Sequence, residues 1–276
     1  MKFAENKLIY SIIKNKIKPF ELALLAKKLF RINRIIYEKE GMYFYIDPVS
    51  DLGYKLMNEG DYEKEMTSAI KSVLNSDSTF IDLGANEGYF SIIAASIIKT
   101  GKIYSIEPQQ RLWPIILKNQ ILNNKTNWQL LPYAVSMEEG NTFISLAPSL
   151  NSGSSSLIKG FSFAGSREIG KKLRTLYWEK QEVRLMPLDK IIFENNLQHV
   201  DLIKIDIEGF ELNAVRSCIE SIRKNIINNF LIEIHPLQLN ALNQRVEEIE
   251  DIFLMNGYNK KIIAENLLLF SCLCNE

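Results

Sequence analysis

The sequence is poor in several features that mark particular classes of protein. It has 3 cysteines and 2 histidines in 276 residues, too few for a disulfide framework or a zinc cluster. Lys+Arg and Asp+Glu number 33 each, so the basic excess of many nucleic-acid-binding proteins is missing. Charged residues interrupt the N-terminal apolar stretch, and no run reaches the ~18 apolar residues that span a bilayer. These absences predict a cytoplasmic protein with reduced thiols, no transmembrane segment and no nucleic-acid partner.

Apolar residues make up 46% of the chain, enough for a large core. Apolar residues recur at helical spacing through residues 1–40, which predicts helices. We expect the lysines on their other faces to be solvated, the alternative being peripheral contact with an anionic membrane. A strand at 42–47 and a helix at 61–74 follow. We therefore predict an N-terminal helical extension with a short strand (1–75) and a larger domain (76–276).

The larger domain alternates between strand and helix patterns, which predicts a parallel sheet with right-handed crossovers. The expected strands are 79–83, 102–107, 128–132, 200–206 and 230–235, the expected helices are about 89–98, 111–122, 210–222 and 239–255, and two terminal strands are expected near 258–263 and 267–272. An insertion at about 137–190, between the third and fourth strands, carries two added strands and glycine-serine segments. Because long loops in compact domains are commonly functional, we interpret this insertion as a substrate lid.

A glycine loop follows the first of these strands. Gly84 and Gly88 are separated by three residues, and Asn86 stands where a dinucleotide-binding G-x-G-x-x-G loop has its second glycine. Glu107 ends the next strand, 19 residues after Gly88, where a carboxylate can accept the hydroxyl hydrogens of a ribose. The same sheet edge gathers further acids: Asp82, Asp206, Glu208 and Glu211. Such an edge repels phosphates but not a cation, which favours S-adenosylmethionine over NAD.

Five segments together resemble the FkbM family of S-adenosylmethionine-dependent methyltransferases. They are "DYEKE", "FIDLGANEGYFSIIAA", "IYSIEPQ", "NSGSSSL" and "DLIKIDIEGFELNAV", within residues 42–235. The resemblance implies an α/β class I methyltransferase (Rossmann-like) fold with a seven-stranded, mostly parallel sheet whose last strand is antiparallel. It implies O-methylation of a hydroxyl of a sugar, a glycan or a related natural product. The alternatives are a non-catalytic or differently specific S-adenosylmethionine-binding protein and an NAD-dependent oxidoreductase.

The resemblance also implies which residues bind S-adenosylmethionine. They lie in and beside the glycine loop and at or just after the ends of three other strands: Asp82, Gly84, Ala85, Asn86, Gly88, Glu107, Pro108, Ala134 and Asp206. Asp82 could instead serve the turn by accepting backbone amides. Tyr133–Ser136 occupies the segment that flanks the adenine in this family. The family often has Gly-Asp after the alanine of this segment, where this chain has Val135, Ser136 and Met137. The acidic contact to the adenine amine therefore has no evident counterpart.

Methyl transfer to an alcohol requires a group that removes the hydroxyl proton. Asp206 and His235 end strands on the ligand edge and are the candidate catalytic residues. Asp206 could instead orient the methionine ammonium, and His235 could be structural before Pro236. Lys204 is expected to extend to a sheet face. No metal site is predicted, the alternative being Asp206 and Glu208 with a third ligand.

Overall fold

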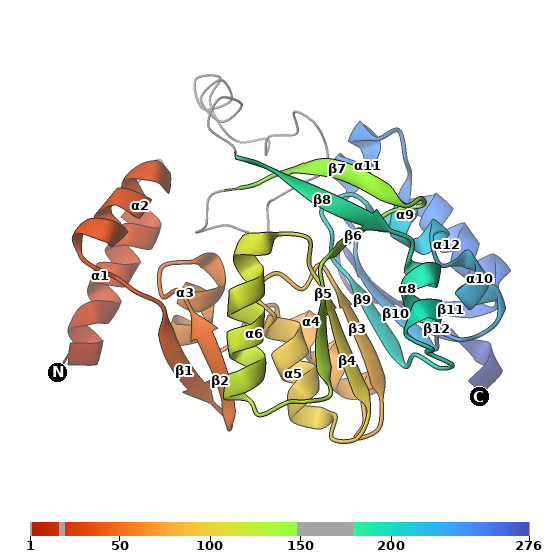
Figure 1. Cartoon of the computed structure of the whole chain (residues 1–276), viewed down its shortest axis with the longest axis horizontal. Coiled ribbons are helices and arrows are strands. Elements are labelled where there is room, and N and C mark those ends of the chain that lie inside the picture. Colours follow the sequence, from red (N-terminus) through yellow and green to blue (C-terminus); the bar gives the residue numbers. More distant parts are fainter. Residues whose placement is uncertain (1, 17–19, 148–178, 276) are drawn as a thin grey trace.

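The computed structural model describes residues 2–16, 20–147 and 179–275, and its centre is a seven-stranded sheet (Figure 1). The strand order is β11-β12-β10-β9-β3-β4-β5. The strands are β3 (Thr79–Leu83), β4 (Lys102–Ile106), β5 (Trp128–Leu131), β9 (Leu202–Ile205), β10 (Asn229–Glu233), β11 (Tyr258–Ala264) and β12 (Leu267–Cys272). Neighbours from β5 to β10 pair in parallel, whereas β12 is antiparallel to both β10 and β11. The predicted mostly parallel sheet with an antiparallel last strand is confirmed.

Helices cover both faces of this sheet. One face carries α3 (Asp51–Asn58), α4 (Lys64–Val73), α5 (Tyr89–Ile97) and α6 (Trp113–Leu122), which follows the 3-10 turn η1 (Gln110–Leu112). The other carries α8 (Leu188–Glu194), α9 (Glu211–Arg216), α10 (Ile219–Arg223) and α12 (Val246–Met255) (Figure 1). Because both faces are covered, the central strands are buried on both sides, as in doubly covered parallel sheets. A last 3-10 turn, η3 (Leu273–Asn275), follows β12.

Two helices that the sequence predicts as continuous are each divided. The segment 210–222 breaks between α9 and α10, where the Asp189 carboxylate accepts the backbone N–H groups of Glu220 and Ser221 and so begins α10 separately. The segment 239–255 breaks between α11 (Pro236–Ala241) and α12, and Asn243 there has a φ of 56°. A left-handed residue cannot continue a right-handed helix, so the break is local in origin.

The N-terminal residues are only partly helical, which corrects the prediction of helices throughout 1–40. Helices α1 (Lys2–Lys16) and α2 (Phe20–Leu29) are followed by strand β1 (Ile35–Lys39), which pairs antiparallel with β2 (Met42–Ile46). Glu40 and Gly41 join the two strands with φ angles of 53° and 76°. Two left-handed residues form the type of turn that suits a two-residue hairpin. The β-branched Ile35 and Ile36 also favour a strand.

The hydrophobic packing continues across the predicted boundary at residue 75. Phe44 of β2, Leu56 of α3 and Ile70 of α4 lie in the same buried cluster as Phe80 of β3. The sequence analysis missed α3, although the Ser50 hydroxyl accepts the Gly53 N–H as a helix N-cap. The division into 1–75 and 76–276 stays a prediction, but residues 42–74 share a core with the sheet.

The insertion adds a small sheet beside the central one. Strands β6 (Tyr133–Val135), β8 (Lys180–Met186) and β7 (Gly140–Ser145) pair in the order β6-β8-β7. This confirms the two added strands. Residues 148–178, which include the glycine-serine segments, lie outside the described residues, and the lid remains a prediction.

Within the part of the chain that the structure describes, no helix combines the length and the apolar composition that crossing a bilayer requires.

Candidate active site at the carboxyl edge of the sheet

The glycine loop runs from β3 to α5 and packs tightly against the end of β9. A Cβ atom on Gly84 would lie 1.9 Å from the Asp206 carbonyl oxygen, and Gly84 has a φ of 78°. Both features require glycine. The backbone N–H groups of Gly84 and Ala85 donate to the Ile106 carbonyl at 3.1 Å each, which joins the loop to β4. The loop is therefore held in place by the backbone of both neighbouring strands.

The residues predicted for cofactor binding and catalysis divide into two groups. Seven of the ten predicted site residues line one pocket: Gly84, Asn86, Glu107, Pro108, Ala134, Asp206 and His235. The other three, Asp82, Ala85 and Gly88, are not among its lining residues. Asp82 is fully buried and accepts a hydrogen bond from Ser91 Oγ at 2.7 Å. Gly88 has a φ of 82° at the start of α5. These features are consistent with a structural role for Asp82 and Gly88, in which they support the conformation of the loop.

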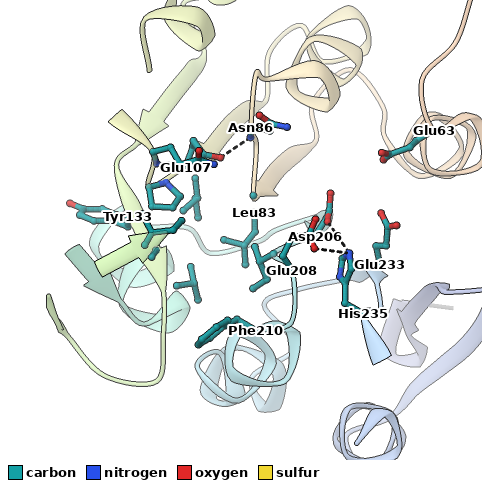
Figure 2. Close-up of a pocket in the computed structure, with 18 of the residues that line it drawn as sticks. Glu63, Leu83, Asn86, Glu107, Tyr133, Asp206, Glu208, Phe210, Glu233 and His235 are labelled. Carbon is teal, nitrogen blue, oxygen red and sulfur yellow. Dashed lines mark hydrogen bonds and ion pairs between the residues drawn. The ribbon is translucent and has the colours of Figure 1, made fainter. Parts of the chain in front are cut away.

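Glu107 lies at the wall of the pocket opposite Asp206 (Figure 2). Its side chain is 3% exposed, and its two oxygens accept the backbone N–H groups of Asn86 and Gln109 at 2.8 Å each. Burial raises the pKa of this carboxyl group to about 7, against the lowering effect of those two N–H groups. Since each carboxylate oxygen has two acceptor positions, both can accept a further hydroxyl hydrogen.

The neighbouring wall is mostly apolar. It is lined by Tyr133, Ala134 and Val135 of β6, Ile144 of β7 and Ile106 of β4. The Arg184 guanidinium, which does not line the pocket, lies 5.4 Å from the centre of the Tyr133 ring and stabilises the ring by a cation–π contact. An apolar wall beside a carboxylate that can accept further hydroxyl hydrogens suits a flat aromatic group.

Lys204 is fully buried, which corrects the expectation that it extends to a sheet face. Its Nζ lies 3.2 Å from Asp82 Oδ1 and 3.5 Å from Asp206 Oδ2. It also donates to the Gly84 carbonyl at 3.0 Å and lies 5.1 Å from the centre of the Phe90 ring. Burial disfavours the ammonium, but the charges of Asp82 and Asp206 outweigh this and raise the pKa of Lys204. One cation thus connects the loop to the end of β9.

His235 follows β10 and faces a group of carboxylates (Figure 2). Its Nδ1 lies 2.8 Å from Glu211 Oε1, and its Nε2 lies 3.8 Å from both Asp206 Oδ1 and Glu208 Oε2. Burial lowers the pKa of His235, but the hydrogen bond and charge of Glu211, with the charges of Asp206 and Glu208, raise it to about 9. The other histidine, His199, is half exposed and contacts Asp201 at 3.3 Å.

Glu63 and Glu233 are pocket residues that the sequence analysis did not identify. They converge with Asp206, each offering one oxygen within 4.8 Å of the others. Burial raises the pKa of Glu63 to about 7, with a further contribution from Asp206. Acidic groups often gather without an ion, and Lys204 already pairs with Asp206, so we assign no metal to this cluster. The only sequence signals were Glu63 in "DYEKE" and Glu233 two residues before His235.

This chain is similar in sequence to one part of a much longer curated protein. The curated AMB antimetabolite synthetase AmbE of Pseudomonas aeruginosa (strain PAO1) is 23% identical over 219 residues, which are 71% of this chain and 10% of that protein. The chain therefore spans about a tenth of the length of this curated relative.

Three solved structures illustrate the structural similarity. An rRNA methylase from Streptococcus thermophilus has 11% identity and a TM-score of 0.42, covering 75% of this chain and 93% of that chain. M. jannaschii TYW2 in complex with AdoMet has 12% identity and a TM-score of 0.40, covering 87% and 85%. A ribosomal protein L11 methylase from Lactobacillus delbrueckii subsp. bulgaricus has 12% identity and a TM-score of 0.40, covering 77% and 79%.

The family described as "Methyltransferase FkbM domain" matches residues 82–260, a span that holds the glycine loop, Glu107, Asp206 and His235. Because this match covers more than half of the chain, the protein belongs to the FkbM methyltransferase family and is an S-adenosylmethionine-dependent methyltransferase with the class I fold.

Proposed function

We propose that this methyltransferase acts on a hydroxyl group of a sugar, a glycan or a related natural product. The observation that carries the proposal is the His235 imidazole, which faces Asp206 in the same pocket as the glycine loop. A hydroxyl is a weak nucleophile whose proton must be removed, so a positioned base is more useful for this acceptor than for a neutral amine.

The pocket residues fit S-adenosylmethionine on three grounds. The Gly84 backbone has no room for a side chain, which keeps the loop flat against the strand ends. Glu107 presents two buried carboxylate oxygens for the ribose hydroxyls. The pocket also carries the acids Glu63, Asp206 and Glu208, which favour a ligand with a sulfonium and an ammonium group over one with phosphates.

We assign the bound adenosine to the side of the pocket that holds Asn86, Glu107 and the apolar wall around Ala134. Asp206 then lies toward the methionine ammonium or the acceptor, and His235 lies beside it. When bound, S-adenosylmethionine supplies an electrophilic methyl group. The chain's contribution is to hold the acceptor oxygen in line with that group and to exclude water from the contact.

His235 Nε2 would receive the hydroxyl proton as the S–CH3 bond of the donor breaks and the O–CH3 bond forms, which would leave S-adenosylhomocysteine. This requires a neutral imidazole, whereas the pKa of about 9 in the protein alone favours imidazolium at neutral pH. A cation bound beside Asp206 disfavours the imidazolium and lowers this pKa, which brings the neutral form nearer to physiological pH. The bound methyl donor would be such a cation, so His235 would be more readily available as a neutral base in the complex.

The proposal is tested with labelled S-adenosylmethionine and a panel of neutral glycosides and cell-envelope glycans. We expect label in alkali-stable methyl ethers of hydroxyl groups, identified by mass spectrometry after hydrolysis. Label confined to alkali-labile methyl esters or to amines would contradict the proposal. Binding of S-adenosylhomocysteine with no transfer to any acceptor would favour the non-catalytic alternative.

The base is tested with His235→Gln, and His199→Gln serves as the matched control at the opposite edge of the sheet. We expect His235→Gln to lower kcat by about 10²-fold or more, the scale of general-base catalysis, while the Kd for S-adenosylhomocysteine stays within threefold. His199→Gln should retain full activity. Equal kcat values in the two variants would remove His235 from the mechanism.

A further inference from the structure

The carboxylate that holds the His235 ring is buried where solvent cannot stabilise it. Glu211 is 0% exposed, and its Oε1 accepts the Gly209 backbone N–H at 2.8 Å while lying 2.8 Å from His235 Nδ1. Among the described residues its Oε2 has no hydrogen-bond partner. A buried carboxylate is costly unless a charge pairs with it, and the imidazole is its one ion-pair partner in the described part of the chain.

The contact determines which imidazole nitrogen faces the pocket. An ionised carboxylate only accepts hydrogen bonds, so Nδ1 must carry the hydrogen toward Glu211. The lone pair of the neutral ring is then on Nε2, the atom that lies 3.8 Å from both Asp206 and Glu208. Figure 2 shows the ring directed toward these two pocket residues.

We infer that Glu211 is a positioning residue that fixes the His235 ring and its Nδ1–H tautomer, so that Nε2 is presented to the acceptor hydroxyl. The inference rests on the proposed O-methyltransferase function and deepens it. Neither neighbour can replace Glu211, since Asp206 and Glu208 contact only Nε2.

The geometry of Glu211 is itself fixed by the turn that precedes α9. Glu208 and Gly209 have φ angles of 54° and 103°, and this turn directs the Gly209 N–H at the Glu211 carboxylate. Glu208 is held separately by Gln238 Nε2 at 3.2 Å. The two carboxylates therefore lie near different ring nitrogens, Glu211 near Nδ1 and Glu208 near Nε2, and each is held by a different hydrogen bond.

Four carboxylates face the imidazole from the elements around it. They are Asp206 and Glu208 after β9, Glu211 on α9 and Glu233 on β10. Lys204 is the cation beside them, and it pairs with Asp206. Removal of Glu211 alone leaves the other three, so its effect can be separated from the general acidity of the pocket.

The experiment is an imidazole NMR titration of Glu211→Gln in the full chain, which has only two histidines. A His199→Gln background leaves the His235 signal alone. We expect Glu211→Gln to move the His235 midpoint down by at least one pH unit and to lower kcat by about 10-fold or more. The KM for S-adenosylmethionine should stay within threefold, because Glu211 is not among the residues that line the pocket.

Glu208→Gln is the matched control for the titration, since Glu208 faces the same ring at 3.8 Å. A smaller midpoint shift in this control than in Glu211→Gln supports the inference. An equal or larger shift, or an unchanged kcat in Glu211→Gln, overturns it.

One measurement needs no substitution at position 211. At pH 10 the imidazole nitrogen shifts of the His199→Gln protein should report the Nδ1–H tautomer for His235, and the Nε2–H tautomer would overturn the inference. Failure of the proposed function gives a different result, because no hydroxyl acceptor would then be methylated by the unmodified protein whatever the tautomer.

Discussion

Replacement of Lys204 by methionine tests whether one buried cation holds the glycine loop to the active edge. Lys204 is 1% exposed and Asp82 is 0% exposed. Methionine has a similar length and no charge, so the cavity stays filled while the Asp82 carboxylate loses its ion pair. The Gly84 carbonyl also loses its 3.0 Å hydrogen bond.

The expected loss of unfolding free energy is about 3–5 kcal/mol, the cost of removing one partner of a buried ion pair. The loss is large beside a typical total of about 5–15 kcal/mol. The second pair of Lys204 adds less, because Asp206 is 24% exposed and its charge is partly screened by solvent.

The assay is urea unfolding followed by circular dichroism, with S-adenosylhomocysteine affinity measured by calorimetry on the same samples. Lys260→Met is the matched control, because Lys260 pairs with Glu250 at 2.7 Å on the surface. This control should lose about 0–1 kcal/mol. The double variant Asp82→Asn/Lys204→Met should recover much of the loss. The reasoning is refuted if Lys204→Met costs no more than Lys260→Met.

Three further predictions follow from the same contacts. Arg34 donates to both oxygens of Glu87, a residue of the glycine loop, at 2.9 and 2.6 Å. Loss of this ion pair in Arg34→Met should disturb the loop and raise the Kd for S-adenosylhomocysteine about tenfold; an unchanged Kd in calorimetry would contradict this. In Gly84→Ala the new Cβ meets the Asp206 carbonyl at 1.9 Å, so binding should be lost; retained binding would show that the loop can shift. The raised His235 pKa contributes stability that is full below pH ~6.5 and lost as the pH rises through about 9. In urea unfolding, the free energy of unfolding of the unmodified protein should therefore fall by an amount on the order of 2 kcal/mol across this pH window. The contribution of His235 to this fall should be absent in His235→Gln.

Much of the site was predictable because its signals are local. Gly84 and Gly88 adopt backbone conformations that few other residues adopt, so their spacing indicates the loop. Glu107 could be predicted as a site residue because it comes at the end of a strand. The alternation of strands and helices likewise determined the sheet. Each of these inferences needed only neighbouring residues and one general rule about parallel sheets.

The missed features depend on contacts between distant segments. Glu63 and Glu233 lie far apart in the sequence, with most strands of the central sheet between them along the chain. They reach Asp206 because α4 packs beside β10. The expectation for Lys204 failed because helices cover both faces of β9 and leave no open face for its ammonium. Strand β1 was not predicted because apolar residues at helical spacing continue through residues 1–40, and the pairing of β1 with β2 depends on a turn at Glu40 and Gly41.

The acidic residues of the pocket lead to a prediction about proton release when the methyl donor binds. Burial raises the pKa of Glu63 and of Glu208 to about 7, so in the protein alone these groups are partly protonated at neutral pH. A bound cation favours the ionised carboxylates, and binding should therefore release protons. S-adenosylhomocysteine has the same ammonium but no sulfonium charge, so it should release fewer. Calorimetry at pH 7 in buffers of different ionisation enthalpy measures both values, and Glu63→Gln should reduce the release without removing it. Equal release by the two ligands would mean that the sulfonium lies away from these carboxylates, which would move the transferred methyl group, and with it the acceptor, to another part of the pocket.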